Sequence, residues 1–142
     1  MTALDALQAC LSAEHASVYG YGVVGGVLAG VAAGSSDQAL AAAGYVEHRR
    51  RRDDLTALIA DQDAVPVPAE AAYELPSRVE NLEDCRRLGR LLEQRATDTY
   101  AAAVAETVTS EREFVARALT ACALRAVDWG AKPVAFPGLA EL

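Results

Sequence analysis

The sequence predicts an all-helical fold built as a bundle of four long helices. Its composition is rich in alanine, 52% hydrophobic and only 6% aromatic, which favours helices over a β-sandwich. Apolar residues recur at a spacing of three to four in four long segments, and Gly and Pro concentrate between those segments. A chain of 142 residues fits one hydrophobic core, so we expect a single domain over residues 1–142.

The first two helices should form an antiparallel pair. The first runs from about Leu4 to the region of Gly30, and its apolar stripe carries Leu4, Leu7, Leu11, Val18, Gly22 and Gly25. A Gly/Ser turn over 34–37 follows, with Ser36 or Asp37 as the expected cap of the second helix. The second helix ends near Gln62, and its face carries Leu40, Gly44, Leu55, Leu58 and Ile59.

A long connection over about 63–80 separates the two halves of the chain. Three prolines in this segment, Pro66, Pro68 and Pro76, block a continuous helix. Fully extended, the segment would span about 60 Å, more than the length of a helix of about 25 residues, so it can cross the whole bundle. The third helix is expected after an Asn81 cap, with a stripe of Leu82, Cys85, Leu88, Leu92, Ala96 and Ala103.

The fourth helix should follow a turn at 109–110. Ser110 and Glu113 have the spacing of a capping box, and the apolar face holds Val115, Ala118, Leu119, Cys122, Ala126 and Trp129. From about 130 to 142 the pattern predicts an extended tail, with Phe136 and Leu139 packed back on the bundle.

Charge and hydropathy bear on whether the protein binds nucleic acid or spans a membrane. A net charge of -7 argues against nucleic acid, and the basic run 49–52 is followed at once by two aspartates, as on a solvated helix face. Residues 16–36 carry no charge and contain a G-x-x-x-G ladder at Gly22, Gly26, Gly30 and Gly34, so a membrane span is one reading. We favour a bundle helix whose glycines allow a neighbouring backbone to approach closely.

The three cysteines, Cys10, Cys85 and Cys122, are odd in number and far apart. This excludes a disulfide framework and a zinc-ribbon spacing, and favours small core residues in a reduced protein. The N-terminus has no basic region typical of a secretory signal. We therefore expect a cytoplasmic protein, without a membrane partner.

Several segments resemble a known family. They are the stretch 11–23 (LSAEHASVYGYGV), the stretch 48–55 (HRRRRDDL), Tyr73-Glu-Leu-Pro, and Ala135-Phe-Pro-Gly-Leu. Together they are similar to an uncharacterised branch of the ferritin-like superfamily, a domain of unknown function of the DUF4439 type, over nearly the whole chain. The resemblance implies a ferritin-like four-helix bundle, two antiparallel hairpins joined by the crossover between helix 2 and helix 3. For the wider superfamily it also implies a di-iron or dimanganese carboxylate centre.

The residues expected at such a centre do not follow the superfamily pattern. Both histidines follow a glutamate, in Glu14-His15 and Glu47-His48, but no Glu-x-x-His motif occurs anywhere in the chain. Instead, if the helices turn near 33 and 109, Glu14 lies opposite Arg51 and Glu93 lies opposite Arg125. His48 and Cys122 stand three residues before these arginines.

Electrostatics favours a metal-free core. Two like charges about 4 Å apart repel by roughly 4 kcal/mol even at a protein-like dielectric, so two divalent cations need several carboxylates. Arg51 and Arg125 would cancel Glu14 and Glu93 instead. We predict no metal cofactor and a polar core of Glu14, His48, Arg51, Glu93 and Arg125, with His15, Glu47 and Cys122 at its periphery.

The functional expectation is a binding or structural module without redox activity or catalytic residues. Its ligand cannot be read from the sequence, and alanine-rich faces with close glycine contacts are compatible with a homodimer. Three alternatives stay open. They are a single metal held by Glu14, His15, Glu47 and His48, a nucleophilic Cys122, and an iron- or manganese-dependent oxidoreductase or ferroxidase.

Overall fold

A computed structural model describes residues 1–139, and within them the chain forms four helices and no strand. The helices are α1 (Ala3–Val31), α2 (Ser36–Ala60), α3 (Leu82–Glu106) and α4 (Thr109–Asp128). Close packing joins α1 with α2, α1 with α3, and α3 with α4. The predicted all-α class and the four helical segments are confirmed.

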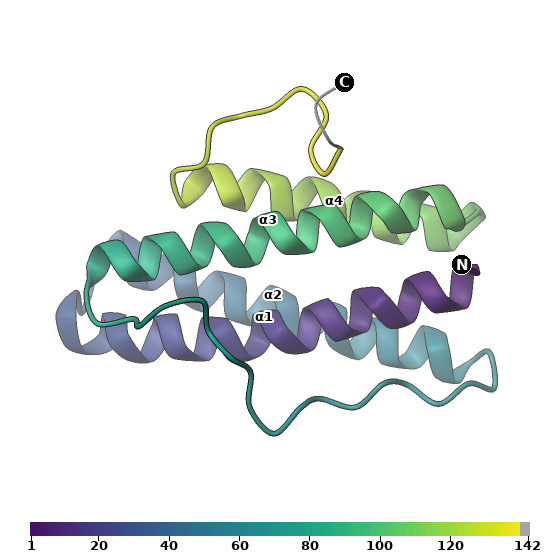
Figure 1. Cartoon of the computed structure of the whole chain (residues 1–142), viewed down its shortest axis with the longest axis horizontal. Coiled ribbons are helices and arrows are strands. Elements are labelled where there is room, and N and C mark those ends of the chain that lie inside the picture. Colours follow the sequence, from purple (N-terminus) through teal and green to yellow (C-terminus); the bar gives the residue numbers. More distant parts are fainter. Residues whose placement is uncertain (140–142) are drawn as a thin grey trace.

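Figure 1 shows the direction of each helix. α1 and α4 run one way along the bundle, while α2 and α3 run the other way. The segment between α2 and α3 passes along the length of the bundle, beside α1. Gln8 of α1 holds it at two points, since its side-chain nitrogen donates to the Val65 carbonyl and its oxygen accepts from Val67 N–H, both at 2.8 Å.

The helix starts are capped unequally. Asn81 caps α3 as predicted, its side chain accepting from the Asp84 amide at 2.8 Å. Ser35 caps α2, one residue before the expected Ser36. The capping box predicted at Ser110 and Glu113 is wrong: α4 begins at Thr109, so Val108 occupies the cap position and has no side-chain oxygen to accept a hydrogen bond from the first backbone N–H groups.

The expectation for the glycine ladder is also wrong. A Cβ added at Gly22, Gly26 or Gly30 would meet nothing within 4 Å, so no neighbouring backbone lies against this stripe. Close approaches occur at glycines of other positions instead, including Gly44 and Gly89. Within the described residues, no helix is both long and apolar enough to cross a membrane.

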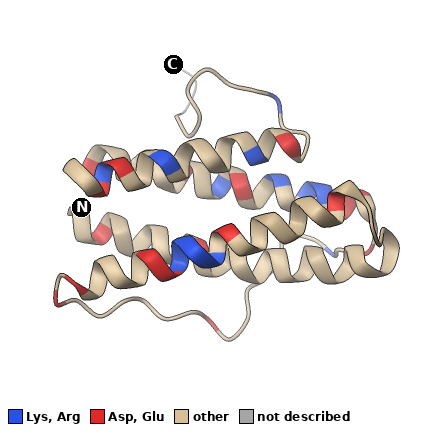
Figure 2. Ribbon diagram, turned by 180° about the vertical axis from the view of Figure 1, so that it is seen from behind, with Lys and Arg blue, Asp and Glu red and all other residues tan. Residues whose placement is uncertain are grey.

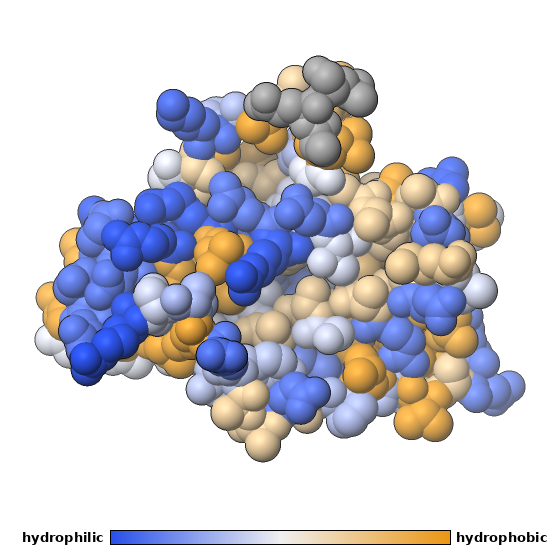
Figure 3. All heavy atoms as spheres, viewed as in Figure 1, coloured by the Kyte–Doolittle hydropathy of each residue, from blue (hydrophilic) through white to orange (hydrophobic). Residues whose placement is uncertain are grey.

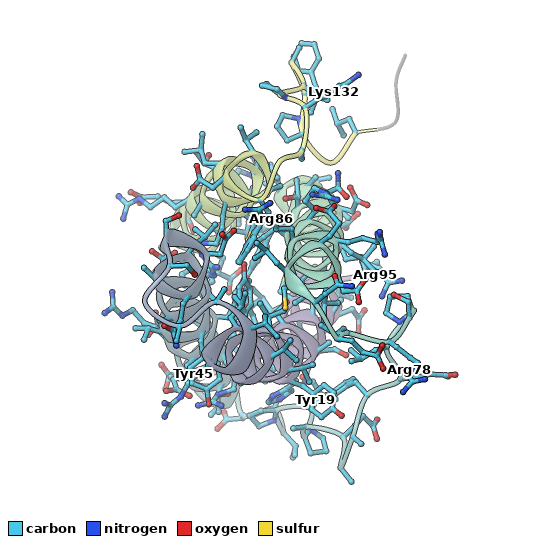
Figure 4. The ribbon with its side chains drawn as sticks, turned by 90° about the vertical axis from the view of Figure 1, so that its left-hand side faces the viewer. Tyr19, Tyr45, Arg78, Arg86, Arg95 and Lys132 are labelled. Carbon is cyan, nitrogen blue, oxygen red and sulfur yellow. The ribbon has the colours of Figure 1, made fainter. Side chains whose placement is uncertain are left out.

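The interior consists of two apolar clusters, one towards each end of the bundle. One is centred on Leu7, Leu11, Leu55 and Ile59, and the other on Val24, Leu28, Leu88 and Trp129. Figure 4, which looks along the bundle, shows the four helices around an interior filled with side chains, with Tyr19, Tyr45, Arg95 and Lys132 outside. The exposed face in Figure 3 mixes hydrophilic and hydrophobic residues.

The tail does not pack as predicted. Phe136 is 68% and Leu139 is 60% exposed, and the tail rises away from α3 and α4 in Figure 1. Its close contact is made by Gly138, where an added Cβ would lie 2.5 Å from the Ala101 side chain and 2.8 Å from the Thr97 carbonyl. Because the backbone rather than a side chain meets α3 here, the large apolar residues on either side turn outward. Residues 140–142 of the predicted tail lie outside the described residues.

Candidate functional site

A group of charged side chains lies inside the bundle, drawn from all four helices. We call it the polar core: Glu14 of α1, His48 and Arg51 of α2, Glu93 of α3, and Arg125 of α4. Glu14, His48 and Glu93 have no exposed surface, and Arg51 is 8% exposed. Burial of this kind is unfavourable unless the charges pair and form hydrogen bonds.

His48 connects the two buried carboxylates. Its Nδ1 bonds Glu14 Oε2, and its Nε2 lies 3.0 Å from Glu93 Oε1. Ionised carboxylates accept hydrogen bonds, so with Glu14 and Glu93 both ionised each ring nitrogen donates and the ring is an imidazolium. Burial lowers the pKa of His48, but the bonds and charges of Glu14 and Glu93 outweigh it, and the net shift is upward.

Glu14 has two further partners. Arg51 Nε donates to its Oε1 at 3.0 Å, and the hydroxyl of Tyr100 bonds the same oxygen. Burial and the nearby Glu14 charge raise the pKa of Tyr100 well above its usual value, so the phenol keeps its proton and stays a donor. Glu14 and Arg51, expected opposite one another, are thus in direct contact.

Glu93 is held by a chain of aromatic donors. Tyr21 OH donates to Glu93 Oε1 at 2.5 Å, and Trp129 Nε1 donates to the Tyr21 oxygen at 2.8 Å. Two glycines make room for these rings: a Cβ at Gly44 would lie 2.6 Å from Tyr21, and one at Gly89 would lie 2.6 Å from Trp129. The sequence predicted Trp129 only as part of an apolar face, because a glycine that faces a ring on another helix does not stand out within a helical pattern.

Arg125 pairs more closely with Glu47 than with Glu93. Its NH2 lies 2.9 Å from Glu47 Oε2, whereas its NH1 lies 3.8 Å from Glu93 Oε1. Glu47 also lies 3.7 Å from Arg51, and its side chain is 42% exposed. Glu47, expected at the periphery of the polar core, therefore joins the two arginines at its surface end.

The network leaves three buried polar atoms without a hydrogen-bond partner among the described residues. They are Glu93 Oε2 and the Nε and NH1 of Arg125. Burial raises the pKa of Glu93, but its bonds with His48 and Tyr21 and the charge of Arg125 lower the pKa by more than burial raises it. The net shift of the Glu93 pKa is downward. With Glu47 included, three carboxylates face three cations, so the site can be electrically neutral.

Two of the peripheral residues differ in position. His15 lies away from the polar core, with its Nε2 2.9 Å from the Val67 carbonyl of the connection, so the set Glu14, His15, Glu47 and His48 is not brought together. Cys122 is buried, and its sulfur, a Glu93 oxygen and a His48 nitrogen all lie within 4.8 Å of one another. Burial raises the pKa of Cys122 well above its usual range, which opposes a nucleophilic thiolate.

Comparison with known proteins places the chain in a family. The model of a family described as "Domain of unknown function (DUF4439)" matches residues 6–141. The chain belongs to the DUF4439 family. A crystal structure of a conserved hypothetical protein, rv2844, from Mycobacterium tuberculosis is similar to this DUF4439 chain, with a TM-score of 0.80 and 32% sequence identity. The similarity covers 89% of this chain and 94% of that chain. No curated protein matches.

Proposed function

We propose that this DUF4439 chain is a ferritin-like bundle in which the polar core replaces a metal centre, and that it is a binding or structural module without redox activity. The observation that carries the proposal is His48, whose two nitrogens both face buried carboxylates. A histidine that ligates a metal must present one unprotonated nitrogen to the ion. Here each ring nitrogen already faces a carboxylate oxygen.

The directions of the helices support the ferritin-like part of the proposal. A crossover between α2 and α3 that passes along the bundle, as in Figure 1, is the connectivity of ferritin-like folds, whereas simple up-and-down bundles use short loops. The polar core lies where such folds hold metal, between facing helices. The fold thus supports a polar core at the position of a ferritin-like metal centre, and the side chains present support the replacement of the metal by ion pairs.

The residues of the polar core do not fit a pair of divalent cations. Within residues 1–139 the fully buried carboxylates are Glu14 and Glu93, and the guanidinium of Arg51 is bonded to Glu14. Arg125 lies 3.8 Å from Glu93. Two added divalent ions would face these permanent positive charges at close range, so we derive no reaction through a metal.

Metal analysis tests this proposal. The full chain, purified from culture supplemented with iron and manganese, should contain far less than one metal ion per chain by inductively coupled plasma mass spectrometry. Its visible spectrum should show no carboxylate-bridged iron absorption. Two ions per chain that are lost on Glu14→Gln or Glu93→Gln substitution would overturn the proposal.

A second candidate function is a metal-dependent oxidoreductase, and one observation favours it. His48, Glu93 and Cys122 offer nitrogen, oxygen and sulfur ligands within 4.8 Å of one another. This mixed set suits zinc or iron better than a manganese pair. If this candidate is right, one ion per chain should be found, and Cys122→Ser should reduce its retention while Cys10→Ser should not.

A further inference from the structure

A groove between α2 and α4 leads to the surface end of the polar core. It encloses about 480 Å³, and its lining includes Glu47, Arg50 and Arg51 of α2 together with Phe114, Arg117 and Ala118 of α4. Figure 2 views the molecule from this side and shows the basic run of α2 between acidic residues. The volume is within the range of small-molecule sites.

The charges in the groove favour an anion. Three arginines and two glutamates line it, an excess of positive charge in a chain whose net charge is -7. Arg117 is paired with Glu113 at the exposed rim, where their side chains are 79% and 61% exposed. Arg50 is exposed and forms no ion pair within residues 1–139, so its charge is available to a ligand.

The side-chain carboxylate of Glu47 lies at the inner end of this groove. It lies 2.9 Å from Arg125 and 3.7 Å from Arg51 and is 42% exposed, so it can turn out to solvent. Arg125 is only 11% exposed, and its Nε and NH1 have no hydrogen-bond partner among the described residues, although NH1 lies 3.8 Å from Glu93 Oε1. Arg125 lies behind Glu47 and does not itself line the groove, and Glu47 contacts its NH2. Buried donors without acceptors are unfavourable, so an acceptor that reaches this guanidinium from the groove could also satisfy donors that Glu47 leaves free.

We propose that the groove binds a small organic carboxylate, whose anionic group takes the place of Glu47 on Arg51 and Arg125. The apolar part of the ligand packs against Phe114 and Ala118, and Arg50 and Arg117 hold the anion from the rim. The inference rests on the proposed function in one respect, because a polar core without metal leaves Arg51 and Arg125 in place to meet the anion. It adds a ligand class to that function.

Calorimetric titration of the full chain tests the site, with benzoate as the probe and benzyl alcohol and inorganic phosphate as comparisons. Benzoate should bind at one molecule per chain and more tightly than either comparison. Arg50→Ala and Arg117→Ala should each weaken benzoate binding about tenfold, the effect of losing one charged hydrogen bond. Arg112→Ala, an exposed arginine of α4 outside the groove, should leave the affinity unchanged.

Glu47→Gln tests the exchange itself. This variant keeps the size of the side chain and removes the competing charge, so benzoate should bind about tenfold more tightly. Equal binding of benzyl alcohol, tighter binding of phosphate than benzoate, or an unchanged affinity in Glu47→Gln would each overturn the inference. Metal analysis of the same samples separates the two proposals: benzoate binding by a metal-loaded chain overturns only the metal-free function, and a metal-free chain that ignores benzoate overturns only this inference.

Discussion

At the scale of single residues, His48 is what allows two carboxylates to be buried side by side. Glu14 and Glu93 have no exposed surface, and both bond the imidazolium between them. Without that cation they would repel one another in a region of low dielectric, where two charges about 4 Å apart interact by roughly 4 kcal/mol or more. The positive charge of the His48 ring therefore stabilises the folded bundle.

Substitution of His48 by Gln should destabilise the chain by about 3–5 kcal/mol at neutral pH, because it removes the cation that two buried carboxylates share. Urea denaturation followed by circular dichroism measures the loss. His15→Gln is the matched control, since His15 bonds the Val67 carbonyl outside the polar core, and its loss should be about 1 kcal/mol or less. Equal losses in the two variants would contradict the role given to His48.

The pKa shifts predict a stability maximum in weakly acidic solution. The pKa of His48 is raised above its ordinary 6.5, so its contribution is complete below that pH and is lost as the pH rises through the folded-state value. The pKa of Glu93 is lowered below its ordinary 4.5, so its contribution is complete above that pH and is lost as the pH falls through the folded-state value.

Thermal denaturation of the wild type should therefore give the highest Tm between these ordinary values, 4.5 and 6.5, with a decline on each side. In His48→Gln both declines should be smaller, because the group that loses its proton on the alkaline side is gone and the main cause of the lowered Glu93 pKa goes with it. A wild-type Tm that rises steadily above pH 6.5 would show that His48 is neutral in the folded chain.

At the scale of elements, the sequence predicted the helices well but not their close contacts. The three-to-four periodicity and the Asn81 cap are local signals, and they located the helices and the α3 start. The glycine ladder misled because spacing alone does not say which side of α1 meets a neighbour. Gly44 and Gly89, which lie inside ordinary helical patterns, carry the close contacts because Tyr21 and Trp129 point at them from other helices.

Gly44→Ala should destabilise the chain by about 1–3 kcal/mol, since the new methyl group would lie 2.6 Å from the Tyr21 ring and rings in a packed core cannot move freely. A shift of the Tyr21 ring would also weaken the hydrogen bond from its hydroxyl to Glu93. Gly22→Ala is the control: nothing lies within 4 Å of its added Cβ, so the better helix propensity of alanine should stabilise by about 0.5–1 kcal/mol. Chemical denaturation should give opposite signs, and a shared sign would show that the packing at Gly44 is misjudged.

At the scale of the whole molecule, the sequence predicted that charged residues meet inside the bundle better than it predicted which of them form pairs. Counting residues outward from the predicted turn near residue 33 placed Glu14 opposite Arg51, and these two residues are in contact. The pairing of Arg125 with Glu47 across α2 and α4 could not be predicted, because it depends on how far those helices separate and on side-chain rotamers. The same is true of His15, which turns to a connection that has no periodicity to place it.

The connection between α2 and α3 gives a prediction for the molecule as a whole, because it joins the two hairpins and is tied to α1 by the side chains of Gln8 and His15. Gln8 makes two hydrogen bonds of 2.8 Å, to Val65 and Val67. Gln8→Ala removes both, and each such bond is worth about 1 kcal/mol. Local opening of the connection should become about fivefold to thirtyfold more frequent, while the helices stay folded.

Limited proteolysis with elastase, which cleaves after small apolar residues, should detect this opening as faster cleavage near Val65 and Val67. Gln94→Ala, an exposed glutamine of α3, should be cleaved at the wild-type rate. Urea denaturation of Gln8→Ala should show a much smaller loss of global stability than the increase in cleavage implies, because the connection opens without unfolding the four helices. If cleavage instead rises only in proportion to global unfolding, then the connection is an integral part of the bundle and not a separately tethered strap.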